Sequence, residues 1–333
     1  MPVRKILVTG GAGFIGSHVV ESLVRAGWEV TVYDDLSSGR REYLKQVAHH
    51  VRMVEGDVLD TSRLRRVLRG HEIVSHQAAQ LEIFRALEEP QFDLKTNTLG
   101  TLSVLEAARA AGVKRVVNAS SACVYGQAKT LPQAESHPQE PNWPYGVSKL
   151  AAEHYVRLYQ TLYGVETVSL RYGIVYGPRE WLGRVLTCFL KRALEGKPPV
   201  IFGDGRQVRD FVFVDDVVRF HNLLLEQNSW SHSCYNVGTG VGTEVRALAE
   251  MVSRVTGAEA EPIYEDAAEG ESSRHMPERK RIPYELKAMV LGVGQARALG
   301  WEPAVSLEEG IQKEWEWMKE NRSLWRVSRS IAV

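Results

Sequence analysis

Residues 5–16 read KILVTGGAGFIG, and this stretch decides the fold class. A short apolar run leads directly into Gly10, Gly13 and Gly16, which are spaced three residues apart. Glycines there allow a tight turn, let backbone N–H groups approach a pyrophosphate, and let the next helix pack close to the strand. Because the turn lies between a predicted strand and a predicted helix, it indicates dinucleotide binding. The residues expected to contact this ligand are Gly10, Gly13, Phe14, Ile15 and Gly16.

Asp34 ends the second predicted strand, about twenty residues after the glycine turn. A carboxylate there accepts hydrogen bonds from adenosine ribose hydroxyls and repels a 2′-phosphate, so the sequence favours NAD over NADP. Arg40 and Arg41 follow closely and keep NADP as the alternative, and a loop cap is the alternative role of Asp34. Asp57, which follows a strand, is expected near the adenine, although aspartate is also a common turn residue there.

The order of elements predicts an α/β fold. Short β-branched runs alternate with helical patterns, and Gly27 and Gly70 lie where helices are expected to stop. This alternation argues for a Rossmann-type, doubly wound parallel sheet with helices on both faces. The expected strands are residues 5–10, 29–35, 72–79, 114–121 and 166–173, and the expected helices are residues 14–27, 62–70, 101–112 and 145–164.

Beyond residue 177 the alternation gives way to loops rich in Gly, Pro and Arg, with further helices expected at 184–196, 243–257 and 306–320. We therefore expect a smaller α+β C-terminal substrate lobe that is interleaved in sequence with the first. The expected boundaries are 1–177 for the NAD-binding Rossmann domain with 208–240 returning to it, 178–207 and 241–325 for the substrate lobe, and 326–333 for a tail.

The composition excludes several classes of protein. The chain has 41 basic and 41 acidic residues, so no bulk charge points to nucleic acid or to an acidic membrane. No apolar run is long enough for a membrane span, which takes about eighteen residues. Three widely spaced cysteines, Cys123, Cys188 and Cys234, fit neither a disulfide framework nor a metal site. A reducing, cytoplasmic location and the absence of a metal site are therefore expected.

Two stretches supply the candidate catalytic residues. NASSACVYG, residues 118–126, includes the end of the predicted strand at 114–121, and open parallel sheets bind ligands at the carboxyl ends of their strands. Ser121 is therefore expected beside the ligand. YGVSK, residues 145–149, places Tyr145 and Lys149 one helical turn apart, where they are surface neighbours. Taken alone, a packed tyrosine and a solvated lysine explain this pair more simply.

A lysine beside a tyrosine has a chemical use. Tyrosine is a poor base near neutral pH because its reference pKa is about 10, and lowering it by about three units requires ~4 kcal/mol. One cation about 4 Å away, at an effective dielectric constant near 20, supplies ~4 kcal/mol. We therefore expect Lys149, helped by a positive nicotinamide ring, to favour the phenolate of Tyr145.

With these residues in this order, the chain resembles the extended short-chain dehydrogenase/reductase family, and within it the nucleotide-sugar epimerases of the UDP-glucose 4-epimerase type. The resemblance runs from about residue 4 to about residue 320. It includes DDLSSG, HQAAQ, NTLGTLSVLEAAR, YGPRE, FGDGRQVRDFVFVDDV, YNVGTG and LGWEP. These motifs are highly specific for the family and much less specific for the sugar.

The resemblance implies NAD-dependent epimerisation at C4 of a nucleotide sugar, such as UDP-glucose or UDP-galactose, a UDP-N-acetylhexosamine or UDP-glucuronate. Tyr145 as phenolate takes the proton of the 4-hydroxyl while the C4 hydride passes to NAD⁺, and Ser121 hydrogen-bonds the reacting oxygen. The 4-keto sugar then turns over and the hydride returns to its other face. Ser121, Tyr145 and Lys149 are the implied catalytic residues.

The resemblance also implies further contacts. Implied cofactor contacts, besides the glycine turn and Asp34, are Asp57, Val58, Ala78, Ala79, Asn97, Tyr145 and Lys149. Implied substrate contacts are Gln80, Ser121, Phe202, Gln207 and Arg209, the last on the nucleotide diphosphate. A homodimer formed by the helices that start near Thr98 and Tyr145 is implied as well.

Two positions bear on the reaction. Related dehydratases carry an Asp-Glu pair where this chain has Ala122 and Cys123, and related decarboxylases carry a glutamate at the second. Epimerisation needs neither residue, and Cys123 is most simply a small packing group. A dehydratase, decarboxylase or 4-keto reductase on the same site is the alternative function, and a non-catalytic dinucleotide sensor is a further one.

Other positions depart from the family pattern. The usual second phosphate clamp, Arg-Pro-Gly-Asp/Glu, is matched to residues 268–271, which read AEGE, so Arg274, Arg279 or Arg281 is a candidate replacement. Ile174 replaces an amide that helps to hold the substrate. Arg85 and Arg184 are candidates for contacting a charged sugar such as a glucuronic acid, with a solvated surface position as the alternative for each.

Overall fold

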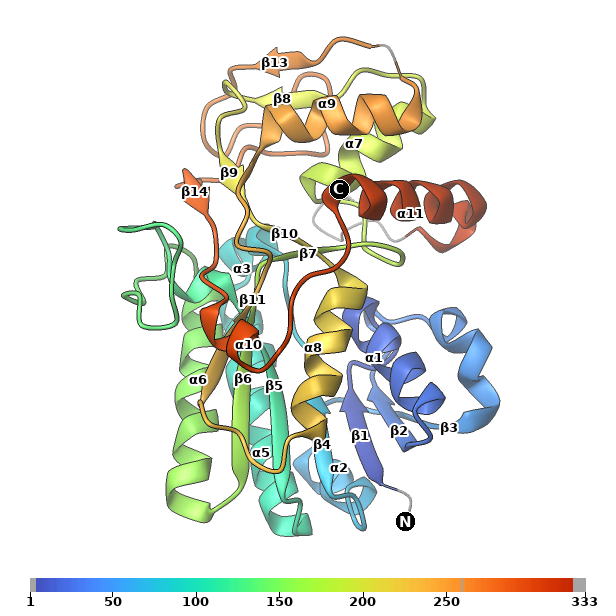
Figure 1. Ribbon diagram of the computed structural model, residues 1–333, viewed down its shortest axis with the longest axis vertical. Helices are drawn as coiled ribbons and strands as arrows, with labels where there is room; N and C mark the ends of the chain where they lie inside the picture. Colours follow the sequence, from blue (N-terminus) through green and yellow to red (C-terminus); the bar gives the residue numbers. More distant parts are fainter. Residues whose placement is uncertain (1–3, 259, 326–333) are drawn as a thin grey trace.

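The computed structural model describes residues 4–258 and 260–325, and its main feature is a seven-stranded parallel sheet (Figure 1). The strand order is β11-β6-β5-β4-β1-β2-β3. The strands are β1 (Lys5–Thr9), β2 (Glu29–Asp34), β3 (Val51–Glu55), β4 (Ile73–His76), β5 (Arg115–Ser121), β6 (Glu166–Tyr172) and β11 (Cys234–Val237). This arrangement confirms the α/β, Rossmann-type fold expected from the alternation of strands and helices.

Helices cover both faces of the sheet because successive strand residues point to opposite sides. Ile6 and Val8 pack in one hydrophobic core with residues of α1 (Phe14–Arg25) and α8 (Val214–Glu226). Leu7 packs in a second core with residues of α2 (Thr61–Val67), α5 (Gly100–Ala111) and α6 (Pro144–Tyr163). Figure 1 shows α1 and α8 on one side of the sheet and α5 on the other.

Short helical segments connect these elements. They are η1 (Arg41–His50), α3 (Ile83–Glu88), α4 (Pro90–Leu94), η2 (Lys95–Leu99) and η3 (Ala122–Val124). Two long helices end at a glycine: Gly112 and Gly164 adopt φ values of 78° and 68° at the ends of α5 and α6. The expected stops, Gly27 and Gly70, follow α1 and α2, and each has a φ of 81°. This left-handed conformation suits glycine because it has no Cβ atom.

The chain leaves the main sheet after β6 and returns to it at β11, and smaller sheets form from the segments before and after that return. They pair β7 (Ile174–Tyr176) with β10 (Phe211–Phe213), β8 (Val200–Phe202) with β13 (Ile263–Glu265), and β9 (Val208–Arg209) with β12 (Thr243–Glu244) and β14 (Ala288–Met289). The accompanying helices are α7 (Val185–Leu194), α9 (Val245–Thr256), α10 (Gly294–Ala298), α11 (Leu307–Glu320) and η4 (Arg322–Leu324).

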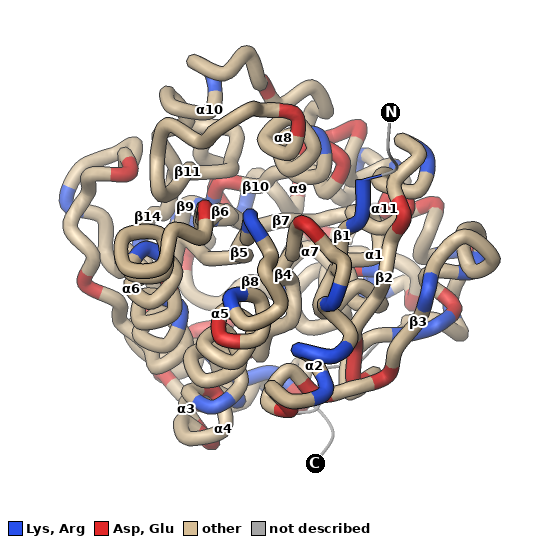
Figure 2. Tube along the Cα trace, turned by 90° about the horizontal axis from the view of Figure 1, so that it is seen from below, with Lys and Arg blue, Asp and Glu red and all other residues tan. Residues whose placement is uncertain are grey.

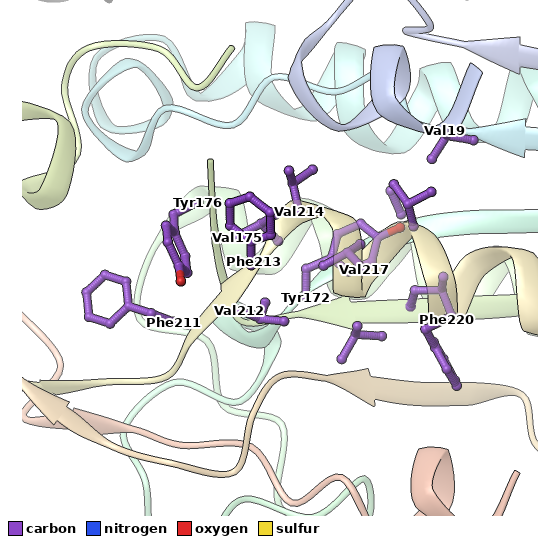
Figure 3. Close-up of a cluster of buried hydrophobic side chains, with 14 of the residues drawn as sticks. Val19, Tyr172, Val175, Tyr176, Phe211, Val212, Phe213, Val214, Val217 and Phe220 are labelled. Atoms are coloured by element: carbon purple, nitrogen blue, oxygen red, sulfur yellow. The ribbon is translucent and has the colours of Figure 1, made fainter. Parts of the chain in front are cut away.

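Most of these later elements lie beyond the carboxyl end of the main sheet, above it in Figure 1, whereas α10 lies beside β11. An aromatic and valine cluster joins them to the sheet (Figure 3), where Tyr176 and Phe213 meet edge to face with ring centroids 5.5 Å apart. The last long helix, α11, is capped at its start, because Ser306 accepts a hydrogen bond from the Glu309 amide at 3.2 Å. The predicted tail, residues 326–333, lies outside the described residues.

Charge is spread evenly over the molecule. Figure 2 shows basic and acidic residues interspersed along the trace, in keeping with the equal numbers of each in the sequence. Among the described residues, no helix combines the length and the apolar character that crossing a membrane requires.

Candidate active site

The glycine turn has the close contacts that its sequence predicts. A Cβ atom on Gly10 would lie 2.6 Å from the amide nitrogen of Ala78, and one on Gly16 would lie 2.1 Å from the carbonyl oxygen of Gly10. Gly10 also has a φ of 64°, which side chains disfavour. Gly13 begins α1 without a side-chain cap, so its first-turn amides face the space above the turn. Such a helix start suits a phosphate.

A cavity of about 350 Å³ opens over this turn and runs along the carboxyl end of the sheet. All but one of the expected cofactor contacts line it: Gly10, Gly13, Phe14, Ile15, Gly16, Asp34, Asp57, Val58, Ala78, Ala79, Tyr145 and Lys149. The exception is Asn97, which is buried behind the wall. Its amide nitrogen donates to Asp93 and Ser148, and its oxygen accepts from the Gln80 amide at 2.9 Å, so it braces the wall and its cofactor contact stays a prediction.

Asp34 lies at the far end of this cavity. Its two carboxylate oxygens accept hydrogen bonds from the amides of Ala12 at 2.9 Å and Leu36 at 2.8 Å, so the side chain is held in one orientation. The arginines that kept NADP open point elsewhere: Arg40 donates to the Trp325 carbonyl, and Arg41 forms an ion pair with Glu55 at 2.8 Å. Neither lines the cavity. These residues therefore fit NAD, with the glycine turn for its pyrophosphate and the Asp34 carboxylate for its ribose.

Tyr145 and Ser121 come together as expected. Pro144 occupies the first turn of α6, which places Tyr145 at the start of the helix, and Ser121 ends β5. Both side chains line the same cavity, and Ser121 Oγ accepts a hydrogen bond from the Cys123 amide at 3.1 Å. Burial raises the pKa of Tyr145, as does the nearby thiol of Cys123, whereas the neighbouring Ser121 hydroxyl and the positive charge of Arg184 lower it.

Lys149 differs from the expectation. It lies on the same helix face as Tyr145, but its Nζ atom donates to the main-chain oxygen of Ala119 at 2.9 Å. Burial lowers its pKa to about 8, against the charges of Asp93 and Glu153, which raise it. The spacing argument counted the attraction between the two groups and left out the cost of burying both. In the protein alone the Tyr145 hydroxyl therefore stays protonated near neutral pH.

A second cavity, of about 260 Å³, meets the first at Ser121 and Tyr145 and extends among the later elements. Of the expected substrate contacts, Ser121, Phe202, Gln207 and Arg209 line it. Gln80 lines the cofactor cavity instead. Its amide nitrogen donates to the Glu82 carbonyl and to Asp93, both at 2.9 Å, so its substrate contact stays a prediction.

Arg209 and Arg279 both line the second cavity. Arg209 is partly buried, forms an ion pair with Glu285 at 3.2 Å and donates to the Val208 carbonyl. Arg279 also lines this cavity and donates to the carbonyl of Gly183 and to the sulfur of Cys188. The sequence named Arg279 as one of three equivalent candidates, because no periodic pattern places the residues of the loop between β13 and β14.

The other candidate arginines have different partners. Arg281 donates to the Ala267 carbonyl at 2.7 Å and lies 3.7 Å from Asp266, and neither Arg281 nor Arg274 lines the second cavity. Residues 268–271 are also away from it. Ile174, at the position where the family has an amide, does line it.

Comparisons with known proteins give one family. A sequence model described as the NAD dependent epimerase/dehydratase family matches residues 6–238. A putative UDP-glucose 4-epimerase of Methanocaldococcus jannaschii is 38% identical, with 95% of this chain and 99% of that protein aligned. A UDP-glucose 4-epimerase of Mycolicibacterium smegmatis is 36% identical over 95% of this chain and 98% of its own length.

Solved structures agree in fold over the whole chain. The Thermotoga maritima UDP-glucose 4-epimerase with UDP-glucose has a TM-score of 0.86 and 37% identity, and covers 96% of this chain and 100% of that one. The protein MoeE5 in complex with UDP-glucuronic acid and NAD has a TM-score of 0.83 and 32% identity, over 95% of this chain and 99% of its own.

Proposed function

Because the chain belongs to the NAD dependent epimerase/dehydratase family, we propose that it inverts C4 of a nucleotide sugar, with a UDP-sugar as substrate. One observation carries the proposal: Ser121 and Tyr145 line both cavities. A sugar bound in the second cavity thus presents its reacting hydroxyl to these side chains and to the cofactor cavity together. The UDP-glucose 4-epimerases among the relatives support the choice of reaction.

The glycine turn and Asp34 would hold NAD, which supplies a hydride acceptor when it is bound. This chain provides the proton chemistry. Tyr145 and Ser121 line the same two cavities, so both can bond the same sugar oxygen, with Tyr145 accepting its proton and Ser121 fixing its position. A phenol with a raised pKa needs help to act as a base. The positive charge of Arg184 lowers the pKa of Tyr145, and we propose Lys149, on the same helix face, as the second source.

Arg209 and Arg279 would bind the nucleotide diphosphate. Guanidinium groups pair well with phosphate oxygens, and these two line the second cavity but not the cofactor cavity. Arg279 would then replace the second phosphate-binding arginine, which residues 268–271 lack. Glu285 forms an ion pair with Arg209 at 3.2 Å, which holds the guanidinium in the cavity.

The residues beside Ser121 favour epimerisation over loss of water. Ala122 is buried and carries no group that transfers a proton. Burial raises the pKa of the Cys123 thiol, which therefore stays neutral and is a poor base. Dehydration needs an acid and a base at these positions, and neither residue supplies one.

The test is product NMR after incubating the purified protein with UDP-glucose, UDP-N-acetylglucosamine and UDP-glucuronate. A C4-inverted product without net release of NADH is the expected result. A 4-keto-6-deoxy product, loss of CO₂, or stoichiometric oxidation of added NADH would establish one of the other family reactions instead. If NAD binds but all three substrates remain unchanged, the result would favour the non-catalytic dinucleotide sensor.

A homodimer belongs to the same proposal. Exposed apolar side chains gather on the outer face of α6 and the turn before α5, where soluble monomers seldom keep a large apolar patch. They are Leu99, Val147, Tyr155, Leu158, Leu162 and Tyr163. A second copy packing on this face would bury them in a four-helix contact.

The three cysteines are free thiols, which supports a reducing, cytoplasmic location.

A further inference from the structure

Arg184 occupies the junction of the two cavities. It lies just before α7 and lines the cofactor cavity and the second cavity alike, together with Ser121 and Tyr145. Its Nη1 atom donates to the Val175 carbonyl at 3.0 Å, and its guanidinium lies over the ring of Trp181, 4.2 Å from the centroid. These two contacts fix the side chain where the reacting part of a sugar would lie.

The charge of Arg184 is only partly balanced. The nearest carboxyl group is that of Glu180, whose Oε1 atom lies 3.5 Å from the arginine Nε. Glu180 is buried, and so is the nearby carboxyl group of Glu314 on α11. Burial raises the pKa of both carboxyl groups, so the pair keeps a proton near neutral pH and offers Arg184 less than two negative charges. The hydrogen bond that Arg184 does make goes to a neutral carbonyl.

A cation at this junction distinguishes sugars. With C4 at Tyr145, its ring neighbours C3 and C5 lie next to the junction, and C6, the substituent of C5, is the position at which acidic and neutral hexoses differ. A carboxylate at C6 accepts paired, charge-assisted hydrogen bonds from a guanidinium, whereas a hydroxymethyl group accepts at most a neutral one. The positive charge therefore favours an acidic sugar over a neutral one.

Arg85, the other candidate, is placed differently. Its guanidinium lies over Phe92, 3.8 Å from the ring centroid, and it is 3.7 Å from Glu89. It lines the cofactor cavity and is not part of the second one. The structure thus separates the two arginines that the sequence left equivalent.

We propose that Arg184 selects a nucleotide sugar with a carboxylate at C6, a hexuronate, as the preferred substrate. This inference rests on the proposed C4 epimerisation. It makes Arg184 a specificity-determining residue for the acidic group, in addition to the diphosphate contacts of Arg209 and Arg279.

The experiment measures kcat and KM for UDP-glucuronate and UDP-glucose with the wild-type holoenzyme, Arg184→Gln and Arg184→Lys. The wild type is expected to have at least tenfold higher kcat/KM for UDP-glucuronate. Arg184→Gln should lower kcat/KM for UDP-glucuronate about 10- to 100-fold more than for UDP-glucose, mainly through KM, because any effect on Tyr145 is common to both sugars. Arg184→Lys should recover part of the loss, because it restores the charge without the paired geometry. Arg206→Gln, at an exposed arginine outside both cavities, is the matched control.

Several results would overturn the inference. A wild-type preference for UDP-glucose would do so and leave the proposed epimerisation standing. An equal loss on both sugars in Arg184→Gln would show that the arginine acts on Tyr145 or on the fold. If both variants fail to fold, calorimetric binding to the wild type decides: UDP-glucuronate must bind more tightly than UDP-glucose. Failure to invert C4 of any sugar would remove the proposed function, and the inference with it.

Discussion

The Nζ atom of Lys149 lies 2.9 Å from the main-chain oxygen of Ala119, so the ammonium of α6 is tied to β5 two residues before Ser121. This bond fixes the distance between the helix that carries Tyr145 and the strand that carries Ser121. The burial that shields this hydrogen bond from solvent also lowers the pKa of Lys149 from 10.5 to about 8. The residue therefore positions the site at a cost in stability.

That cost predicts the effect of Lys149→Met. Since the folded pKa is below the unfolded one, the buried charge destabilises the protein below pH 8 by about 3 kcal/mol, at about 1.36 kcal/mol per unit. The stability of the wild type should then rise between about pH 8 and pH 10.5, where the unfolded chain binds the extra proton.

Removing the ammonium also removes its hydrogen bond, worth about 1 kcal/mol, so Lys149→Met should gain roughly 2 kcal/mol at pH 7 and lose activity. Urea unfolding at pH 7 and at pH 10.5 measures the stability gained by the variant and the pH dependence of wild-type stability. A variant less stable than the wild type at pH 7 would contradict the reading of Lys149 as a costly buried cation.

Tyr145→Phe isolates the base. The ring still fills its buried place at the start of α6, but the group that exchanges the proton is gone, so kcat should fall by about 10²- to 10⁴-fold. NAD affinity, measured by calorimetry, should change little. Tyr155→Phe alters an exposed tyrosine of the same helix and should keep full activity. Wild-type turnover by Tyr145→Phe would assign the proton transfer to another group.

The cofactor end of the site was readable from sequence because it depends on local rules. A tight turn needs Gly10 and Gly16 whatever surrounds it, and the helical period alone places Tyr145 beside Lys149. The carboxyl end of β5 predicts Ser121 in the same way. Each of these inferences uses residues within one strand, turn or helix.

Long-range placement was not readable. Gln80 and Asn97 both bond Asp93, and a side chain turned toward a buried carboxylate leaves no periodic signal. Arg279 reaches the second cavity from a long loop, where sequence gives no direction. The pKa of Tyr145 depends on burial, which spacing does not report. The sequence therefore predicted the fold and the common location of Ser121 and Tyr145 better than the partners of buried side chains.

Arg279 provides a test of that loop. Arg279→Gln should raise KM for the UDP-sugar by about 10- to 100-fold, because a charged hydrogen-bond donor to the diphosphate is lost. Arg281→Gln is the matched control, since Arg281 lies two residues away and bonds the Ala267 carbonyl outside the cavity. The reverse order of effects, with Arg281→Gln the more damaging, would move the second clamp to Arg281.

Asp34 should set the choice of cofactor. Asp34→Asn keeps the size of the side chain but removes the charge that repels a 2′-phosphate, so the preference for NAD over NADP should fall at least about tenfold. Binding of each dinucleotide to cofactor-free protein measures the ratio. Arg41→Gln should leave it unchanged, because Arg41 is paired with Glu55 outside the cavity. A shift toward NAD in Arg41→Gln would revive the NADP alternative.

The apolar face of α6 should control assembly. Leu158 and Leu162 lie one turn apart on the exposed side of the helix, with 44% and 63% of their surfaces exposed. A glutamate at either place would bury an unpaired charge in a dimer contact, so Leu158→Glu and Leu162→Glu should give monomers in analytical ultracentrifugation. Val241→Glu, at an equally exposed apolar residue away from α6, should leave the dimer intact. A wild-type monomer at micromolar concentration would refute the proposed contact. Because Tyr145 and Lys149 begin this same helix, dissociation is also expected to lower activity.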